Sequence, residues 1–161
     1  MKSVDNDFLK MLSQYQGIVH KVNLVYFNTS DDRKDNFQEI VYQLWKSFPS
    51  LKDETKIGSW IYAVAINVSI SKIRKDSKYV FTDSIPEIVH TDDTNMFEQD
   101  MDFQRLLEAI RHFNETDKSI MFLYLEEYSY KEIAEIIGIS ASNVGVKIHR
   151  LISKLQKQLK G

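Results

Sequence analysis

The chain has 161 residues and a formal net charge of −2, so it is long enough for one domain or two small ones, and its total charge does not by itself indicate a nucleic-acid partner. Its 43% hydrophobic residues suffice for packed cores, and its low content of Gly and Pro favours helices. The absence of Cys excludes disulfides and thiolate metal sites and fits a reducing cytoplasm. No apolar run resembles a signal peptide or a membrane span, so we expect no stable membrane insertion.

Three amphipathic helices are predicted in the N-terminal half, because apolar residues recur there every three or four positions. The first covers residues 8–27, with a break at Gly17. The second covers residues 31–48, and the third covers residues 60–78 with Ser59 as its cap. Three such helices make a small bundle. The residues expected to face its core in the second and third helices are Phe37, Ile40, Val41, Leu44, Trp45, Phe48, Ile61, Val64, Ala65, Val68 and Ile73.

The segment 79–102 interrupts this helical pattern. It contains seven Asp and Glu and no Lys or Arg, whereas residues 1–78 have a net charge of +3 and residues 103–161 a net charge of +2. We interpret the segment as an acidic linker that is extended by its own charge repulsion. The predicted fold class is therefore all-α, with two small helical domains joined by an acidic linker.

The C-terminal domain is predicted to begin with two helices. The first covers residues 103–113, where Leu106, Leu107 and Ile110 form an apolar side. Thr116 is expected to cap the second. These helices would support the segment that follows.

Residues 129–159 have the pattern of a short helix, a tight turn and a longer helix. Ser129 and Glu132 are spaced as a capping box, which marks the start of the short helix. Gly138 suits the left-handed conformation that ends a helix, and Ser140 is placed to cap the next one. In a helix-turn-helix of this kind the second helix enters the major groove of DNA. The alternative is an ordinary αα-hairpin with a solvated basic face.

Two parallel stripes are predicted on the longer helix. The apolar stripe, which would face the core, consists of Val144, Ile148, Leu151 and Leu155. The polar stripe, about 100° further round the helix, consists of Asn143, Lys147, Arg150 and Lys154. We expect the first residues of this helix at base edges and its cations at phosphates.

Four segments, in this order, resemble those of bacterial sigma factors, specifically the two-domain group called extracytoplasmic-function sigma factors. The first two are DDRKDNFQEIVYQLWKSF, with its acidic start and Gln-Glu pair, and GSWIYAVAINVSISKIRK, with its basic end. The other two, which resemble the first helix and the recognition helix of sigma region 4, are SYKEIAEIIGIS and SNVGVKIHRLISKLQ. The form N-V-x-V-K-I-H-R is similar to versions common in Bacteroidetes.

The resemblance implies that residues 1–78 are sigma region 2, which docks on core RNA polymerase and binds the −10 promoter element. The residues that would dock on the clamp helices of the polymerase β′ subunit are Asp35, Gln38, Glu39 and Tyr42. A polar patch flanked by aromatic residues is a reasonable interface anchor. A plain acidic surface is the alternative.

Melting of the −10 element without ATP requires a pocket for an unpaired base beside a cationic track. By resemblance, the loop 48–59 would capture the flipped base. The residues that would follow the single strand are Asn67, Ser71, Lys72, Arg74 and Lys75. Trp60 and Tyr62 are candidates to stack on bases, although Trp60 is at least as readily explained as a core residue.

Residues 103–161 would be sigma region 4, which reads the −35 element. The residues implied by the resemblance are Ser142, Asn143, Lys147, Arg150 and Lys154, with Lys131 as a further phosphate contact. Two positions depart from the family, which often has a Lys where this chain has Gly145 and a smaller polar residue where it has Val146. One DNA contact of the family is therefore missing.

The resemblance also implies a set of partners. These are core RNA polymerase, including its β subunit, promoter DNA and, as is common in the family, an anti-sigma factor, with a monomer as the free state. The acidic linker would run through the RNA-exit region of the polymerase, where it mimics a polyanion. A solvated tether without a specific path is the alternative.

The alternatives to this function are an enzyme and a stand-alone regulator. An enzyme is not indicated, because the four His are scattered without metal-ligand spacing, and no phosphate-binding glycine loop or nucleophile elbow is present. We therefore expect no cofactor, no metal and no catalytic residues. The second alternative is a stand-alone helix-turn-helix regulator, which would bind its promoter tightly by itself, usually as a dimer.

Overall fold

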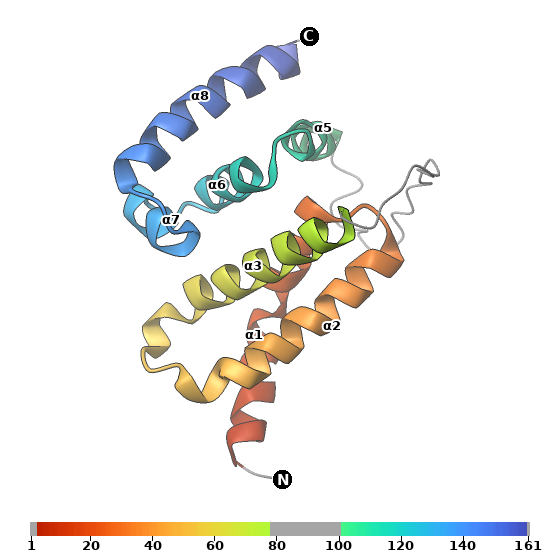
Figure 1. Ribbon diagram of the computed structural model, residues 1–161, viewed down its shortest axis with the longest axis vertical. Helices are drawn as coiled ribbons and strands as arrows, with labels where there is room; N and C mark the ends of the chain where they lie inside the picture. The colour runs from red at the N-terminus through yellow and green to blue at the C-terminus, as the bar shows by residue number, and fades with distance from the viewer. Residues whose placement is uncertain (1–2, 78–100, 161) are drawn as a thin grey trace. The chain divides into compact units, whose positions relative to one another are not determined.

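This computed structural model describes residues 3–77 and 101–160, and every regular element within them is a helix (Figure 1). The all-α fold class is thus confirmed. The chain divides into two compact units, Met1–His90 and Thr91–Gly161. Most of the acidic linker expected at 79–102 lies outside the described residues, and its last two positions begin a helix.

The first unit contains three long helices, α1 (Ser3–Tyr26), α2 (Ser30–Ser47) and α3 (Ile57–Ser77). Two short 3₁₀ turns, η1 (Phe48–Ser50) and η2 (Glu54–Lys56), connect α2 to α3. Each long helix packs against the other two, so the core lies along the axis of a three-helix bundle. Its fully buried apolar side chains include Val19, Val22, Ile40, Leu44, Ile61 and Ala65.

Three expectations for this unit are corrected. Helix α1 is continuous through Gly17, because one glycine costs a helix only about 1 kcal/mol and the packed face on either side offsets that. Helix α3 begins at Ile57, so Ser59 lies inside its first turn and is not a cap. Trp45, expected in the core, is 48% exposed. It follows the buried Leu44 by one position, about 100° round the helix, and therefore points away from the core.

A buried polar network joins the three helices. The side-chain amide of Asn36 donates to Asn23 Oδ1 and to Ser69 Oγ, both at 2.8 Å. Asn23 Nδ2 in turn donates to the Arg33 carbonyl at 3.1 Å. All three side chains are buried, so these bonds replace contacts with water that folding removes. No pattern in the sequence predicted this network.

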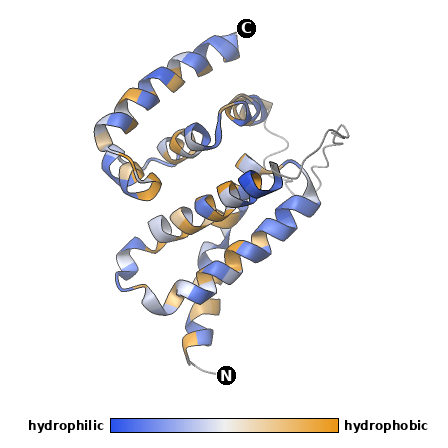
Figure 2. Cartoon of the chain, viewed as in Figure 1, coloured by the Kyte–Doolittle hydropathy of each residue, from blue (hydrophilic) through white to orange (hydrophobic). Residues whose placement is uncertain are grey.

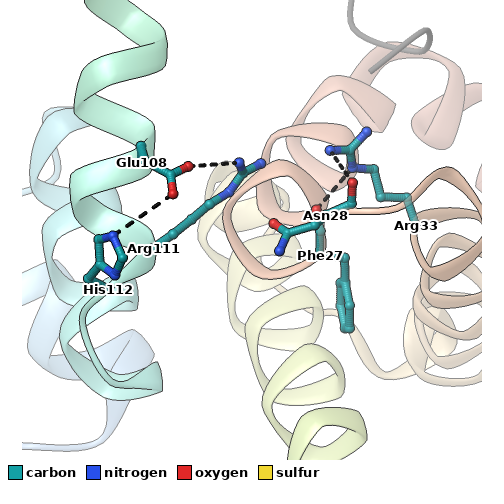
Figure 3. A network of polar contacts seen from close by, with 6 residues as sticks. All are labelled: Phe27, Asn28, Arg33, Glu108, Arg111 and His112. Carbon is teal, nitrogen blue, oxygen red and sulfur yellow. Dashed lines mark hydrogen bonds and ion pairs between the residues drawn. The ribbon is translucent and has the colours of Figure 1, made fainter. Parts of the chain in front are cut away.

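The turn between α1 and α2 is closed by Arg33 (Figure 3). Its Nε donates to the Phe27 carbonyl at 3.0 Å, and one of its Nη atoms donates to the Asn28 carbonyl at 3.4 Å. Thr29 begins α2 by accepting a hydrogen bond from the Asp32 backbone N–H at 3.2 Å. A side-chain donor and a side-chain cap thus satisfy backbone groups that the helix ends leave open.

The second unit contains α5 (Met101–Arg111), α6 (Glu115–Leu125), α7 (Tyr130–Ile137) and α8 (Ala141–Lys160). Helix α8 packs against the other three, which makes it the central element of this unit. The fully buried apolar side chains here include Ile120, Met121, Leu123, Ile133, Val144, Ile148 and Leu151.

The cap of α6 differs from the expected Thr116. Asn114 precedes the helix in an extended conformation, and its Oδ1 accepts from the Asp117 backbone N–H at 2.8 Å. Asn is a strong N-cap residue, so the helix starts two residues earlier than expected.

On α5, Glu108 forms ion pairs with Arg111 at 3.7 Å and, when the imidazole is protonated, with His112 at 3.9 Å (Figure 3).

Hydrophobic and hydrophilic residues alternate along the helices of both units (Figure 2). This pattern is typical of helices with one face in a core and the other in solvent. Within the described residues, no helix combines the length and the hydropathy that crossing a membrane requires.

Candidate nucleic-acid and protein interfaces

The helix-turn-helix of the second unit has the local geometry that its sequence predicts. Ser129 Oγ accepts from the Glu132 backbone N–H at 3.1 Å, while the Glu132 carboxylate accepts from the Ser129 backbone N–H at 2.9 Å. Gly138 has a φ of 89° in the left-handed region, and its N–H donates to the Ala134 carbonyl at 2.8 Å. Ser140 Oγ accepts from the Asn143 backbone N–H at 3.1 Å and caps α8. The expected caps and turn glycine are confirmed.

The apolar stripe of α8 is buried along its whole length, which confirms the predicted core face. Its four members are Val144, Ile148, Leu151 and Leu155. Because they lie on one side of the helix, they determine which residues of α8 face outward.

This orientation of α8 gives the members of the polar stripe different degrees of exposure. Asn143, Arg150 and Lys154 are exposed. Lys147 is different: its side chain is only 32% exposed, and its Nζ lies 3.6 Å from Asp117 Oδ1 of α6. At about 100° per residue, Lys147 lies only about 70° from the middle of the buried stripe, whereas Arg150 lies about 130° from it. Lys147 is therefore the cation of the stripe that is closest to the protein interior.

Asp117 is the partner that the sequence did not reveal. The residue is 8% exposed, and its Oδ1 has no hydrogen bond within the described residues apart from the ion pair with Lys147. A buried carboxylate is costly unless it is paired. The two residues are thirty positions apart in the chain, so no helical spacing signals the pair.

In the first unit, α2 and α3 line an open groove of about 1010 Å³. This groove brings together all four residues proposed for polymerase binding and four of the five proposed for −10 binding. The former are Asp35, Gln38, Glu39 and Tyr42, and the latter are Asn67, Ser71, Lys72 and Lys75. Arg74 is exposed but does not line the groove. One continuous surface thus combines a polar side from α2, which carries two carboxylates, with a side from α3 that carries two lysines and the carboxylate of Asp76.

The segment between α2 and α3, proposed as a base-capturing loop, is ordered by its own hydrogen bonds. Asp53 Oδ1 accepts from the Thr55 backbone N–H at 3.0 Å and from the Thr55 hydroxyl at 2.5 Å. These hydrogen bonds from the Thr55 side chain and backbone hold the pKa of Asp53 below its usual value. The exposed carboxylate is therefore an integral part of the turn η2.

The aromatic residues near this loop have different environments. Trp60 is partly buried, and its ring centroid lies 6.3 Å from that of Phe48. Tyr62 is only 2% exposed, so its ring belongs to the core and the expectation that it stacks on bases is wrong. Trp45 is instead at the surface, where its Nε1 donates to Asp5 Oδ1 at 3.2 Å beside an apolar groove between α1 and α2.

Among the described residues, no group of three or more His, Cys, Asp and Glu has the arrangement of a metal site. What the two units do offer is an exposed cationic helix face in one and a polar, partly basic groove in the other. Surfaces of this kind suit polyanions and protein partners.

Comparison with protein families gives two matches along the chain. Residues 11–79 match sigma-70 region 2, and residues 103–155 match sigma-70 region 4. Among curated proteins, the chain is 26% identical over 132 residues to the RNA polymerase sigma factor YlaC of Bacillus subtilis, covering 78% of this chain and 76% of that protein. It is 25% identical, over an alignment of 176 positions, to the ECF RNA polymerase sigma factor SigW of the same organism, and the alignment covers 99% of this chain and 93% of that protein.

Two solved structures have similar folds. One is the sigma factor RpoE in complex with the anti-sigma factor NepR from Bartonella quintana, with a TM-score of 0.75, 20% identity, and coverage of 96% of this chain and 97% of that one. The other is CnrH in complex with the cytosolic domain of CnrY, with a TM-score of 0.69, 13% identity, and coverage of 97% and 89%. At this level of identity the likeness shows the fold alone. The similarity to Bacteroidetes versions stays a prediction.

Proposed function

This chain belongs to the sigma-70 family, in its extracytoplasmic-function group, and on that premise we propose that it binds core RNA polymerase and directs promoter-specific initiation of transcription. The observation that carries this function is the presence of region 2 followed by region 4 in one chain. A stand-alone helix-turn-helix regulator is not favoured, because residues 11–79 match a sigma region and not a sensing domain. The protein would be a non-catalytic subunit, acting in the cytoplasm with the polymerase.

For the polymerase, the proposed contact is the exposed face of α2 with Asp35, Gln38, Glu39 and Tyr42. The three polar residues and the half-exposed tyrosine ring lie on one side of the helix. Glu39 Oε2 accepts from Gln43 Nε2 at 2.9 Å, which restrains the carboxylate at the surface. An aromatic ring beside restrained polar groups suits a protein interface.

For the −10 element, the proposed contacts follow α3 from the middle of the helix to its C-terminal end. Asn67, Ser71, Arg74 and Lys75 are exposed, and Lys72 is partly exposed. Their amide, hydroxyl and cationic groups match the bases and phosphates of a single strand. The segment 48–59, with its ordered turn at Asp53, is proposed to hold the flipped base.

For the −35 element, the proposed contacts lie at the start and on the exposed side of α8. Ser142 and Asn143 are in its first turn, where base-edge contacts are expected. Arg150 and Lys154 are exposed cations further along, and Lys131 adds one at the start of α7. Lys147 is proposed to contact DNA only by leaving, or by sharing, its ion pair with Asp117.

The domain arrangement completes the proposal. We assign core docking and −10 binding to residues 1–78, −35 binding to residues 103–161, and the connection to the acidic linker 79–102. Since one solved neighbour is a complex of the sigma factor RpoE with the anti-sigma factor NepR, an anti-sigma factor is the proposed regulator of this chain as well. The free protein is proposed to be a monomer.

The decisive experiment is transcription in vitro from a promoter library. Core polymerase free of other sigma factors is incubated with and without the purified chain, and the 5′ ends of the transcripts are sequenced. The proposal predicts start sites that appear only with the chain and share −10 and −35 sequences. Unchanged start sites would refute it. Tight promoter binding by the isolated chain as a dimer would support the regulator instead.

A further inference from the structure

The four buried residues of α8 determine which row of side chains points directly away from the protein. At about 100° per residue, position 146 lies about 170° from the middle of the buried stripe, almost opposite the core. Ser142, Val146, His149 and Ser153 form this outermost row, and all four are exposed. The stripe with Asn143 and Arg150 lies to one side of it. In a helix that enters the major groove, the outermost row of the first turns comes closest to the bases.

Val146 is the unusual member of this row. Its side chain is 62% exposed, whereas the other large apolar residues of α8 within the described region are buried or half-buried. Packing does not require a valine here, and a β-branched side chain slightly disfavours a helix. A single exposed apolar residue is common on protein surfaces, so the exposure alone carries no argument. The informative feature is the location of Val146, which lies between polar residues on the face that is proposed to point at DNA.

The residue before Val146 is a glycine against which an aromatic ring packs. Gly145 has no side chain, and a Cβ at this position would lie 3.3 Å from Cε2 of the Tyr130 ring. The ring at the start of α7 therefore lies against the bare backbone of α8. A glycine within a helix costs about 1 kcal/mol relative to alanine. Here it allows that close approach and leaves Val146 without a side-chain neighbour at the preceding position.

We propose that Val146 contacts the C5-methyl group of a thymine in the −35 element and thereby determines promoter specificity. Among the groups that base pairs present in the major groove, the thymine methyl is the apolar one, and the others are hydrogen-bond donors and acceptors. A valine pressed against those polar groups would remove them from water without pairing them. This inference rests on the proposed function, because it assumes that α8 reads the −35 element.

The test uses the full chain with core polymerase on a promoter obtained from the library. Each thymine of the −35 element is replaced in turn by deoxyuridine, which removes only the methyl group. Initiation by the unchanged protein is expected to fall about fourfold at one position, the effect of losing contact with about one buried methyl-sized group. With Val146→Ala the same replacement should have almost no effect, so the two changes should be strongly non-additive.

A matched control is Ser153→Ala, in the same row but about two turns further from the start of α8. It should keep the full deoxyuridine effect. Val146→Ser should lose the thymine preference in a new library selection while its far-ultraviolet circular dichroism is unchanged, because the residue is exposed. Failure of such variants to fold would show instead that Val146 serves packing and would overturn the proposal.

The outcomes separate this inference from the function on which it rests. If no start sites depend on the chain, both the sigma function and the role of Val146 are refuted. If start sites do depend on the chain, a −35 consensus made only of G·C pairs refutes the role of Val146 alone. The same holds for a deoxyuridine effect that is equal in the Val146→Ala variant.

Discussion

The two units of this sigma factor present their functional side chains in different ways. In the first unit, the proposed polymerase and −10 residues come from two helices, and all of them except Arg74 line one groove. A buried polar network joins the three helices of this unit. In the second unit, nearly all proposed −35 residues lie on α8, whose rotation is set by four buried residues of the same helix. The first surface therefore depends on packing between helices, and the second on the orientation of a single helix.

The strongest test of this contrast is Asn36→Ala. Its side-chain amide donates to both Asn23 and Ser69. The substitution therefore leaves the buried Asn23 Oδ1 without this donor, removes one of the two hydrogen bonds of the Ser69 hydroxyl, which still donates to the Ala65 carbonyl, and opens a small cavity. We expect a loss of about 3 kcal/mol in the free energy of unfolding of the first unit.

The measurement is denaturant unfolding followed by tryptophan fluorescence. Both tryptophans of the chain, Trp45 and Trp60, are in the first unit, so the signal reports on that unit. Lys34→Ala, at an exposed position of the same helix, should change the free energy of unfolding by less than about 0.5 kcal/mol. Equal effects of the two substitutions would mean that the network does not hold the helices together.

Glu39→Lys should separate the functions of the two units. Reversing this exposed charge is expected to weaken binding to core polymerase by about tenfold or more, because like charges across an interface are unfavourable. The measurement is co-purification of the chain with core polymerase. Arg150→Ala is the complementary control, which should keep assembly intact and reduce −35-dependent initiation by about tenfold. Undiminished co-purification of the Glu39 variant would remove α2 from the docking surface.

Asp117→Asn asks whether the ion pair restrains a DNA-binding cation. Without the carboxylate, Lys147 is free to reach a phosphate, so binding of the holoenzyme to its promoter should strengthen. The slope of the logarithm of affinity against the logarithm of salt concentration should steepen by about 0.9.

The matched control is Glu135→Gln, which removes one negative charge at an exposed position of α7. It should leave the slope nearly unchanged, because the removed carboxylate does not pair with Lys147. If both substitutions change the slope alike, the effect is one of net charge, and the Asp117–Lys147 pair does not restrain binding.

Gly145→Ala should have the smallest effect. Alanine favours the helix by up to about 1 kcal/mol, and the new methyl would crowd the Tyr130 ring at 3.3 Å. Because Tyr130 is exposed, its ring has room to shift, so we expect a net stabilisation of about 0.5 kcal/mol. Slower hydrogen exchange of the α8 amides would show it. Faster exchange would mean that the ring cannot move.

Much of the second unit could be predicted, because its determinants are local. The capping box and the left-handed Gly138 each involve residues within about one helical turn, and the buried stripe is a regular repeat along a single helix. The cap of α6 was missed because Asn114 and Thr116 are both acceptable cap residues, and only the observed hydrogen bond identifies Asn114.

In the first unit, the helices could be predicted but the fate of individual side chains could not. Trp45 was expected in the core and is exposed, whereas Tyr62 was a candidate to stack on bases and is buried. That difference depends on where the neighbouring helices lie. The proposed site residues were chosen by resemblance, and their meeting in one groove followed from the packing of α2 on α3.

The amino-acid sequence by itself determined the helices, the caps of α7 and α8, the distribution of charge along the chain and the family of this protein. These features depend on contacts within a few residues or on motifs that are read directly along the chain. Only the tertiary structure decided which polar residues are buried together, such as Asn23, Asn36 and Ser69, and that Asp117 pairs with Lys147. The physical reason is that burial and pairing between distant residues depend on the relative placement of helices, which no local pattern specifies.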